Sequence, residues 1–187
     1  MDMLEQMILQ AKNGTGWNPE FAESKNYKFW KAILDIKTCK PCRDNHGKIW
    51  LVAEKINKKP PLHPNCRCSI IPLHTLKAGT ATTAKYNGSD WHLKYTNRLP
   101  NYYISENELK ELGWERGNKP SNFVIGKMLH KYYKNKNNHL PDSPNRIWYE
   151  ADINYTQGKR NSQRILWSND GLIFVTFDHY ETFYEIV

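Results

Sequence analysis

The 187-residue sequence has no long apolar run, and no stretch approaches the roughly 18 residues that identify a membrane-spanning helix. Its first residues, MDMLEQMILQ, lack a basic segment and a cleavage site, so we expect no Sec-type secretory signal. If the protein is exported, another route must carry it. Cysteine is absent from the second half, which excludes disulfides spread along the chain.

Positive charge is unevenly distributed. Residues 1–98 hold 16 Lys and Arg against 8 Asp and Glu, whereas residues 99–187 hold 11 of each, so the formal net charge of +8 lies in the first half. Such a basic segment is compatible with binding to nucleic acid or an acidic surface, and equally with an ordinary solvated surface. We expect this excess to lend no support to a site in the second half.

The cysteines cluster in residues 39–71, CKPCRDNHGKIWLVAEKINKKPPLHPNCRCSII. Cys39 and Cys42 form a knuckle that presents two thiolates from one turn, and Cys66 and Cys68 follow a proline-rich bend. This spacing favours a structural Zn²⁺ with four sulfur ligands. Two local disulfides or free thiols are the alternatives, and His46 and His63 are spare ligands if one cysteine does not bind.

In the first half, apolar spacing predicts a helix over residues 2–12, and residues 29–36 predict a strand or a short helix. Residues 73–88 are rich in Thr, Ala and Gly and predict a linker. We therefore divide the chain into a cysteine-bearing unit (1–72), this linker, and a second domain (89–187).

In the second domain, Ser89 or Asp90 can cap a short helix that ends near residue 97. Ser105 and Glu108 form a capping box for a second helix that Gly113 ends, with Leu109, Leu112 and Trp114 on its apolar side. Strand patterns follow, two of them joined by a hairpin signal at 168–171. Helices followed by an antiparallel meander predict an α+β fold. The expected strands are 146–153, 164–170, 172–178 and 182–187.

Four side chains in the second domain can perform metal-free phosphodiester cleavage. Glu150 is a candidate base and His179 a candidate acid with a pKa suited to neutral pH. Arg160 and Arg164 can hold the charge that develops on phosphate oxygens. Each has a plainer interpretation: Glu150 as a surface carboxylate, His179 as a turn histidine, and the arginines as sheet cations paired with Asp152 or Asp170.

Residues 89–187 resemble the barnase-type microbial ribonucleases. The resemblance rests on LPxxYIS (99–105), LGW (112–114), EADINYTxGxRNSxRILxSxDGLI (150–173) and DHYxTFxxI (178–186). It implies an endoribonuclease with short helices and a five-stranded antiparallel sheet. It also implies that the RNA 2′-hydroxyl attacks the adjacent phosphorus and leaves a 2′,3′-cyclic phosphate, without a metal.

The resemblance implies further roles in the second domain. Tyr180 lies beside the base site, and Tyr133 can stack on a base. Lys136 and Asn137 stand where the family carries a guanine-binding arginine and glutamate, which puts strict guanine preference in doubt. Glu106 stands where the family carries a lysine near the scissile phosphate, and Lys127 or Lys159 is a possible replacement. Positions expected to be structural are Asp152, Tyr155, Asn161 and Asp170.

The cysteine segment resembles the end of phage head morphogenesis proteins of the Mu F-like family. The resemblance covers residues 28–72 and rests on Thr38 with the first cysteine pair, on Gly47 and on PPLHPNCRC (60–68). It implies the end piece of a phage-type or secreted toxin-type protein with a cargo domain attached.

Together, these observations predict an endoribonuclease toxin or effector that cleaves single-stranded RNA, with zinc as a structural ion. Such a toxin implies an acidic, barstar-like immunity protein that covers the basic cleft. A phage head or a specialised export system would carry it, and it would act in the cytoplasm of a target bacterium. The alternative is a catalytically weakened structural or RNA-binding protein associated with phage heads.

Overall fold

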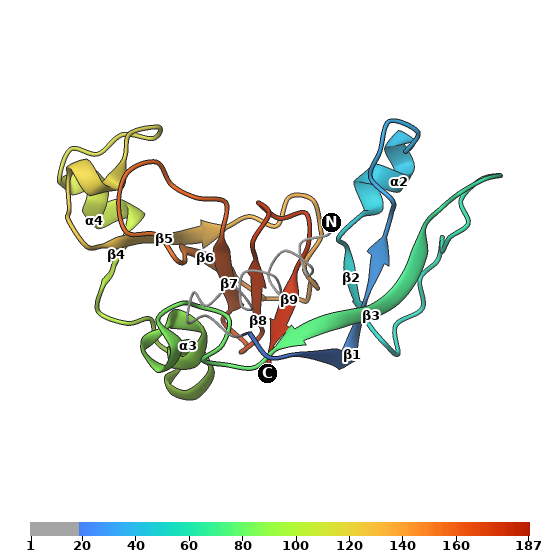
Figure 1. Cartoon of the computed structure of the whole chain (residues 1–187), viewed down its shortest axis with the longest axis horizontal. Coiled ribbons are helices and arrows are strands. Elements are labelled where there is room, and N and C mark those ends of the chain that lie inside the picture. Colours follow the sequence, from blue (N-terminus) through green and yellow to red (C-terminus); the bar gives the residue numbers. More distant parts are fainter. Residues whose placement is uncertain (1–18) are drawn as a thin grey trace.

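The computed structural model of the protein describes residues 19–187. Within this range nine strands form one continuous sheet, in the order β2-β1-β3-β9-β8-β7-β6-β5-β4 (Figure 1). The strands are β1 (Phe21–Lys31), β2 (Ile49–Leu51), β3 (Ser69–Leu76), β4 (Tyr103–Ser105), β5 (Met128–Tyr133), β6 (Trp148–Asp152), β7 (Arg164–Ser168), β8 (Ile173–Thr176) and β9 (Tyr184–Ile186). Three α-helices of this range, α2 (Lys40–Asn45), α3 (Ser89–Thr96) and α4 (Glu106–Glu111), and two 3₁₀ turns, η1 (Lys85–Asn87) and η2 (Pro120–Asn122), lie between them.

The expected five-stranded sheet is wrong, because the sheet has nine strands, whereas the predicted α+β class is correct. Strands β5 to β9 do form an antiparallel meander, but both of its edges are extended. β4 adds in parallel to β5, and β3 adds in parallel to β9, bringing β1 and β2 with it. An edge strand exposes unpaired N–H and C=O groups, and β3 satisfies those of β9.

Residues 73–88, expected to be a linker, begin inside β3 and then fold back on the sheet. Ala78 and Ala81 are buried in the same apolar cluster as Leu93 of α3. The capping role expected for Ser89 or Asp90 is not found, because Gly88 is the N-cap of α3 and no side chain caps it. The buried Asp90 carboxylate instead accepts hydrogen bonds from the backbone N–H groups of Gly79 and Ala81 and from the Thr82 hydroxyl.

Helix α4 follows the expected pattern at its start. Ser105 Oγ accepts from Glu108 N at 3.1 Å, and Glu108 Oε2 accepts from Ser105 N at 2.8 Å, which completes the capping box. Gly113, with φ +87°, ends the turn after the helix. Leu109 is buried in a small cluster with Trp114, but Leu112 is 55% exposed and does not belong to the apolar side.

The hairpin between β7 and β8 also forms where expected. Ser168 N donates to Leu172 O at 2.9 Å, and Gly171 has φ +94°, a conformation that favours glycine. The register of this meander places Glu150 opposite Leu166 on β7 and opposite Lys131 on β5. Alternate side chains of a strand point to the same face, so Glu150 and Asp152 lie on one face of the sheet. Arg164 lies on that face too, because it is directly opposite Asp152.

The first and second halves of the chain share one apolar core cluster. Side chains from β1, β2 and β3 pack in it against side chains that follow residue 139. Its buried members are Tyr27, Phe29, Ile49, Leu73, Leu140, Trp148, Leu166, Phe174 and Phe183. Of the strand or short helix expected over 29–36, only residues 29–31 form a strand, as the end of β1, which begins at Phe21, and residues 32–36 are irregular.

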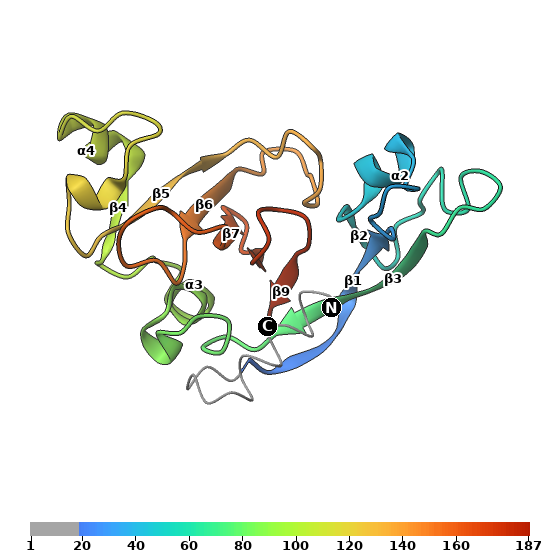
Figure 2. The same cartoon turned by 45° about the horizontal axis from the view of Figure 1, so that its top comes forward.

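The two halves also meet at a close backbone contact. Gly47 has φ +82°, and a Cβ there would lie 2.4 Å from the carbonyl oxygen of Glu181, so a side chain is excluded. Ile49 N donates to His139 O at 2.8 Å across the same seam. Figure 2 shows α2 facing the loops of the second half at this end of the sheet.

The helix expected over residues 2–12 lies outside the described residues. Among residues 19–187, no helix is long and apolar enough to cross a bilayer.

Candidate active site

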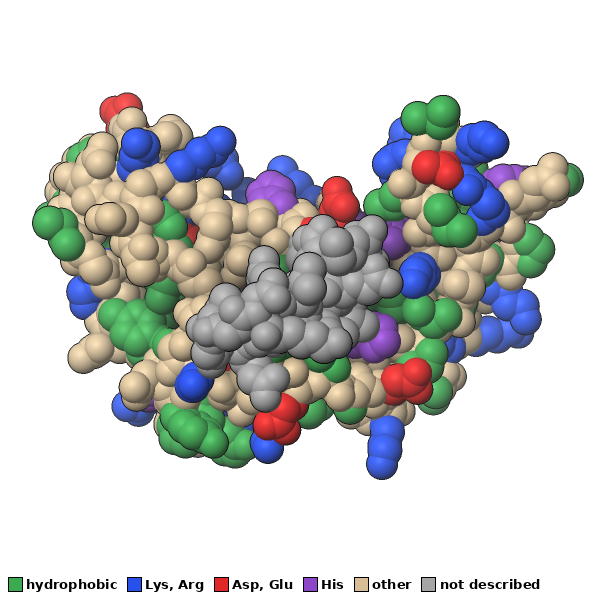
Figure 3. All heavy atoms as spheres, viewed as in Figure 1, with side chains coloured by type: hydrophobic (Ala, Val, Ile, Leu, Met, Phe, Trp, Pro, Cys, Tyr) green, Lys and Arg blue, Asp and Glu red, His purple; other side chains and the backbone are tan. Residues whose placement is uncertain are grey.

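A cleft of about 930 Å³ opens on the sheet face that carries Glu150. It brings together the four candidate catalytic residues, Glu150, Arg160, Arg164 and His179, and its wall includes residues of the first half. The space-filling view shows a hollow between two raised ends of the molecule, with Lys and Arg side chains on both (Figure 3). One cation of the first half, Arg43, therefore does line this cleft, contrary to our expectation from the charge distribution.

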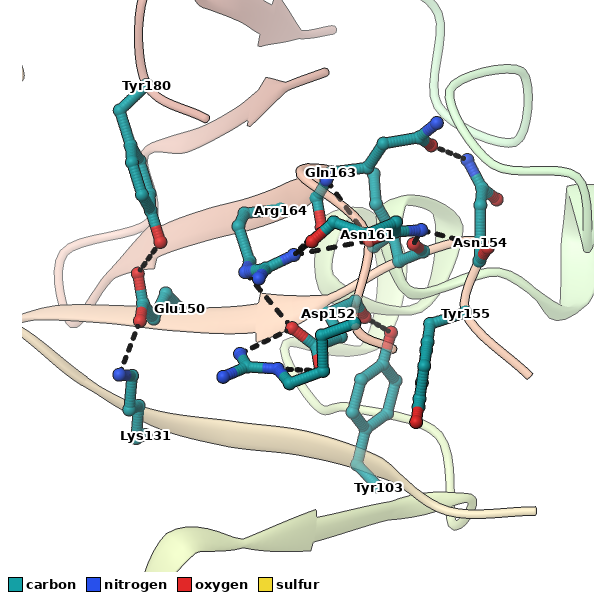
Figure 4. A network of polar contacts seen from close by, with 12 residues as sticks. Tyr103, Lys131, Glu150, Asp152, Asn154, Tyr155, Asn161, Gln163, Arg164 and Tyr180 are labelled. Atoms are coloured by element: carbon teal, nitrogen blue, oxygen red, sulfur yellow. Dashed lines mark hydrogen bonds and ion pairs between the residues drawn. The ribbon is translucent and has the colours of Figure 1, made fainter. Parts of the chain in front are cut away.

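Glu150 lies at the floor of the cleft and is 5% exposed. Tyr180 donates its hydroxyl to Glu150 Oε2 at 2.6 Å, and Lys131 Nζ lies 3.1 Å from Oε1. Figure 4 shows these two side chains approaching the carboxylate from opposite sides. A buried carboxylate held by two donors keeps a fixed orientation, as a catalytic base requires.

The side chain of His179 is exposed at the rim of the cleft, on the loop between β8 and β9. His179 and Tyr180 have φ of 61° and 75°, two consecutive non-glycine residues in the left-handed region. Asp178 fixes this conformation, because its carboxylate accepts from Glu181 N at 3.1 Å and from Thr182 N at 2.9 Å. Strained backbone held by its surroundings is characteristic of functional sites.

Two tyrosines pack together beside Glu150. The rings of Tyr133 and Tyr180 stack with centroids 5.4 Å apart. Burial, with the nearby Glu150 charge, raises the pKa of Tyr133 to about 12, and burial followed by Glu150 raises that of Tyr180 still further. Both phenols therefore stay protonated, and Tyr180 remains a donor to Glu150.

Asp152 holds the two arginines (Figure 4). Arg160 donates Nε and Nη2 to its two carboxylate oxygens at 2.8 and 2.7 Å. Arg164 Nε lies 3.0 Å from Asp152 Oδ1 without the alignment of a hydrogen bond, and its Nη1 donates to Asn161 O at 2.7 Å. Burial alone would lower the pKa of Arg160, but the hydrogen bonds and charge of Asp152 outweigh it and raise that pKa.

All four positions expected to be structural make contacts within the fold, and among them Tyr155 donates its hydroxyl to the carbonyl oxygen of Gly158 at 2.7 Å. Asp152 pairs with both arginines, as their plainer interpretation predicted. Both arginines nevertheless also line the cleft. Asn161 donates to Ile153 O at 2.9 Å and supports the turn before Arg164. Asp170 instead binds Arg146, with Oδ2 2.7 Å from Nη2.

The expected substrate-binding residues divide into two groups. Tyr133, Lys136, Asn137 and Tyr180 line the cleft, whereas Lys127 does not and donates instead to the carbonyl oxygen of Asn101. The cation beside the base is Lys131, which sequence reasoning missed. The alternation of residues along β5 could have identified it, because Lys131 is directly opposite Glu150 in the register.

Glu106, which stands where the resemblance leads us to expect a lysine, lines the cleft and can therefore act on a substrate bound there. Its carboxylate pairs with Lys110 at 3.1 Å. Burial would raise the pKa of Glu106, but Lys110, Lys131 and Arg116 outweigh this and lower it. The anion at this position is therefore surrounded by cations.

The cysteine cluster lies at α2, with Cys39 as the N-cap of this helix and Cys42 within it, and none of its members lines the cleft of the candidate catalytic residues. Two groups of donors each have their ligand atoms within 4.8 Å of one another: Cys39, Cys42 and His63, and Cys42, Cys66 and Cys68. His63 Nε2 lies 3.2 Å from Cys39 Sγ and 3.3 Å from Cys42 Sγ. Of the two histidines named as spare ligands, the structure brings His63, and not His46, to the four predicted thiols.

These separations fit a tetrahedral zinc ion. Zn–S bonds of about 2.3 Å place two sulfur atoms roughly 3.8 Å apart, close to the 3.6 Å between Cys42 Sγ and Cys66 Sγ. His63 Nδ1 lies 2.8 Å from the carbonyl oxygen of Pro64, which only accepts. That contact places the proton on Nδ1 and leaves the Nε2 lone pair facing the thiols, the usual arrangement of a ligating histidine.

Comparison with known proteins identifies two families along the chain. Residues 4–71 match the family described as phage Mu protein F like protein, and residues 74–187 match the ribonuclease family. A ribonuclease of Bacillus intermedius and one of Bacillus pumilus are each 37% identical over 121 residues, covering 61% of this chain and 69% of the relative. A ribonuclease of Heyndrickxia coagulans is 38% identical over 104 residues, covering 52% of this chain and 91% of the relative.

Proposed function

Because the chain belongs to the ribonuclease family, through a match that spans residues 74–187, we propose that it is an endoribonuclease acting on single-stranded RNA in this cleft. The observation that carries the proposal is the shared cleft of Glu150, His179, Arg160 and Arg164, with Glu150 held by Tyr180. Separate ribonuclease relatives support the same activity.

The reaction uses the side chains of the cleft in fixed roles. Glu150 takes the proton of the RNA 2′-hydroxyl as its oxygen bonds to phosphorus. The bond from phosphorus to the 5′-oxygen breaks, and His179 protonates that leaving oxygen. The products are a 2′,3′-cyclic phosphate and a 5′-hydroxyl end.

Charge on the non-bridging oxygens is held by the two arginines and by Lys131. Asp152 uses one edge of the Arg160 guanidinium, which fixes its plane and leaves the remaining N–H groups for phosphate. Lys131, which lies 3.1 Å from Glu150, takes the role proposed for Lys127 or Lys159 and replaces the cation missing at Glu106. Preorganised donors of this type are worth about 3–4 kcal/mol each when removed from a catalytic site.

The test is the pattern of RNA ends after incubation with the purified protein. We expect cyclic phosphate ends, no cleavage of an oligonucleotide that is 2′-deoxy at every position, and unchanged cleavage in EDTA. Intact RNA at micromolar protein, with both the wild type and Glu106→Gln, would contradict the proposal.

The alternative is an RNA-binding protein with weakened catalysis. The position of Glu106 in the cleft favours it, since an anion there opposes phosphate binding. The two are separated by growth: expression of an active ribonuclease is toxic, and His179→Ala relieves the toxicity. Equal growth with and without His179→Ala supports the alternative.

We further propose a structural Zn²⁺ held by four of the five donors Cys39, Cys42, His63, Cys66 and Cys68. Cys42 belongs to both donor groups, so Cys42→Ser should lose the ion completely. His63→Ala and Cys68→Ser decide the fourth ligand, and elemental analysis of the purified variants measures it. Full zinc in Cys42→Ser would exclude this site.

The fusion of a phage Mu F-like segment to a ribonuclease supports a toxin or effector role. In this proposal the first segment belongs to the carrier, a phage head or a specialised export route, and the target is a bacterial cytoplasm. An acidic, barstar-like immunity protein would cover the basic cleft. Co-expression with such an inhibitor should restore growth, and no restoration would argue against this partner.

A further inference from the structure

The wall of the cleft on the α2 side comes from the segment that matches the phage Mu F-like family, not the ribonuclease family. Leu34, Arg43 and His46 line the same cleft as Glu150 and His179. Neither family match assigns a role in the ribonuclease site to these residues. Of the three, Arg43 carries a charge that attracts phosphate.

Arg43 differs from two neighbouring cations, Lys40 and Arg67, in having no carboxylate partner among residues 19–187. Lys40 on the same helix pairs with Asp44, and Arg67 pairs with Asp35. Within residues 19–187, no carboxylate forms an ion pair with Arg43, whose Nη2 donates to the backbone oxygen of Asp35 at 3.0 Å. That contact fixes one edge of the guanidinium, while an exposed side chain leaves the other N–H groups for a ligand.

The short helix that carries Arg43 is tied to both halves of the chain. His46 Nδ1 accepts from Ala32 N at 3.0 Å, and Gly47 N donates to Trp30 O at 3.0 Å, which joins the end of α2 to β1. Gly47 also packs directly on Glu181, beside the loop of His179. Arg43 therefore has a defined place relative to the catalytic loop.

The cleft as a whole is suited to an extended polyanion. Its lining has more cations than anions, and several cations have no ion pair within residues 19–187. The cations are Arg43, Arg116, Lys131, Lys134, Lys136, Arg160 and Arg164, and the anions are Glu106, Glu150 and Glu181. The basic side chains on both raised ends of Figure 3 agree with a strand that crosses the hollow.

We propose that Arg43 is a substrate-binding residue that holds a backbone phosphate of the RNA beyond the scissile one. The phage Mu F-like segment thus completes the binding cleft of the ribonuclease. This inference rests on the proposed ribonuclease function, but it concerns only the length of RNA that the cleft holds.

The test compares substrates of two lengths with the full chain. For a ribonucleotide of about ten residues, Arg43→Ala should raise KM about 3- to 20-fold, the range expected for one partly exposed charged contact, with kcat unchanged. For a ribodinucleotide, which has no backbone phosphate beyond the scissile one, both constants should stay the same. Equal effects on both substrates, or none, would overturn the inference.

Lys40→Ala is the matched control, because Lys40 is on the same helix, is 83% exposed and does not line the cleft. It removes the same charge and should leave KM close to the wild type. Arg43→Lys should recover part of the affinity, since it restores the charge but not the fork. A Lys40→Ala effect as large as that of Arg43→Ala would mean that the contact is nonspecific.

Binding of a 2′-deoxy decanucleotide, followed by fluorescence anisotropy, separates this inference from the proposed function. It requires no cleavage, so it reports on Arg43 even if the protein does not cut RNA. The slope of log K against log salt should be smaller by about 0.7 in Arg43→Ala, as expected when the protein neutralises one phosphate fewer on a single strand. An unchanged slope alongside normal cleavage by the wild type would defeat only the Arg43 proposal.

Discussion

The floor of the cleft and its rim are built in different ways. On the floor, Glu150, Asp152 and Arg164 are buried, and each is held by charged or hydrogen-bonding partners. On the rim, Arg43, Lys136 and Asn137 are exposed, and no ion pair within residues 19–187 holds the two cations. In the proposed ribonuclease, the floor would therefore maintain the chemistry, whereas the rim would be free to change which RNA is bound and how tightly.

The largest effect expected is at the floor, in Glu150→Gln. Glutamine keeps the shape of the side chain but cannot take the 2′-hydroxyl proton, so kcat should fall by about 10²- to 10⁴-fold. The measurement is the initial rate of cleavage of a ribodinucleotide. Glu181→Gln, at the rim, is the control, and its kcat should change by a few-fold at most. A small effect of Glu150→Gln would remove the contrast between floor and rim.

Asp152→Asn tests whether the floor also stabilises the fold. Removing the charge leaves two partly or fully buried guanidinium groups without their anion, which should cost about 3–5 kcal/mol of the free energy of unfolding. The pair of Asp170 with Arg146 gives the comparison: the Asp170 side chain is 45% exposed, so Asp170→Asn should cost about 1 kcal/mol or less. Urea denaturation measures both, and equal costs would contradict the assignment of Asp152 to a buried network.

Acid should destabilise the contact between the α2 side of the cleft and the second half of the chain. Burial lowers the pKa values of His46 and His139 below the ordinary value. The unfolded chain therefore binds more protons below about pH 6.5, and stability is lost as the pH falls through that range. The measurement is the free energy of unfolding between pH 8 and 5.

His46→Asn sharpens this prediction. Asparagine offers an oxygen to Ala32 N, as His46 Nδ1 does, but does not titrate. The variant should lose less stability than the wild type on acidification. An unchanged pH profile would assign the acid sensitivity to other groups.

The smallest effect expected is at the rim, in Glu106→Gln. Neutralising this anion releases Lys110 from its ion pair and removes a negative charge near Lys131 and Arg116, so KM for RNA should fall about 2- to 5-fold. Glutamine is preferable to lysine, which would add a further cation to this group. Steady-state kinetics measures the change, and an increase in KM would show that Glu106 assists binding.

The sequence predicted the local features of the second domain well. The capping box of Ser105 and Glu108 and the hairpin at 168–171 depend on residues a few positions apart, and both are present. The motif residues Glu150 and His179 do meet in one cleft. These features are encoded by neighbours in the sequence, so a pattern is sufficient to find them.

The features that the sequence did not predict depend on distant partners. β3 has Pro72 in its middle and runs into a segment typical of linkers, and it forms a strand because β1 and β9 flank it. Arg43 reaches the cleft only because α2 packs beside the loop of His179. No local pattern contains either relation, since each is decided by tertiary packing.

The parallel pairing of β3 with β9 also has a consequence for how the protein is made. Thr75 pairs with Glu185, so β3 has no partner on that side while the ribosome is still producing the residues between them. Contacts so distant in sequence form late and slow the folding of a chain. One edge of β3 in the nascent first half therefore stays unpaired, and the cleft is complete only after β9 has been synthesised.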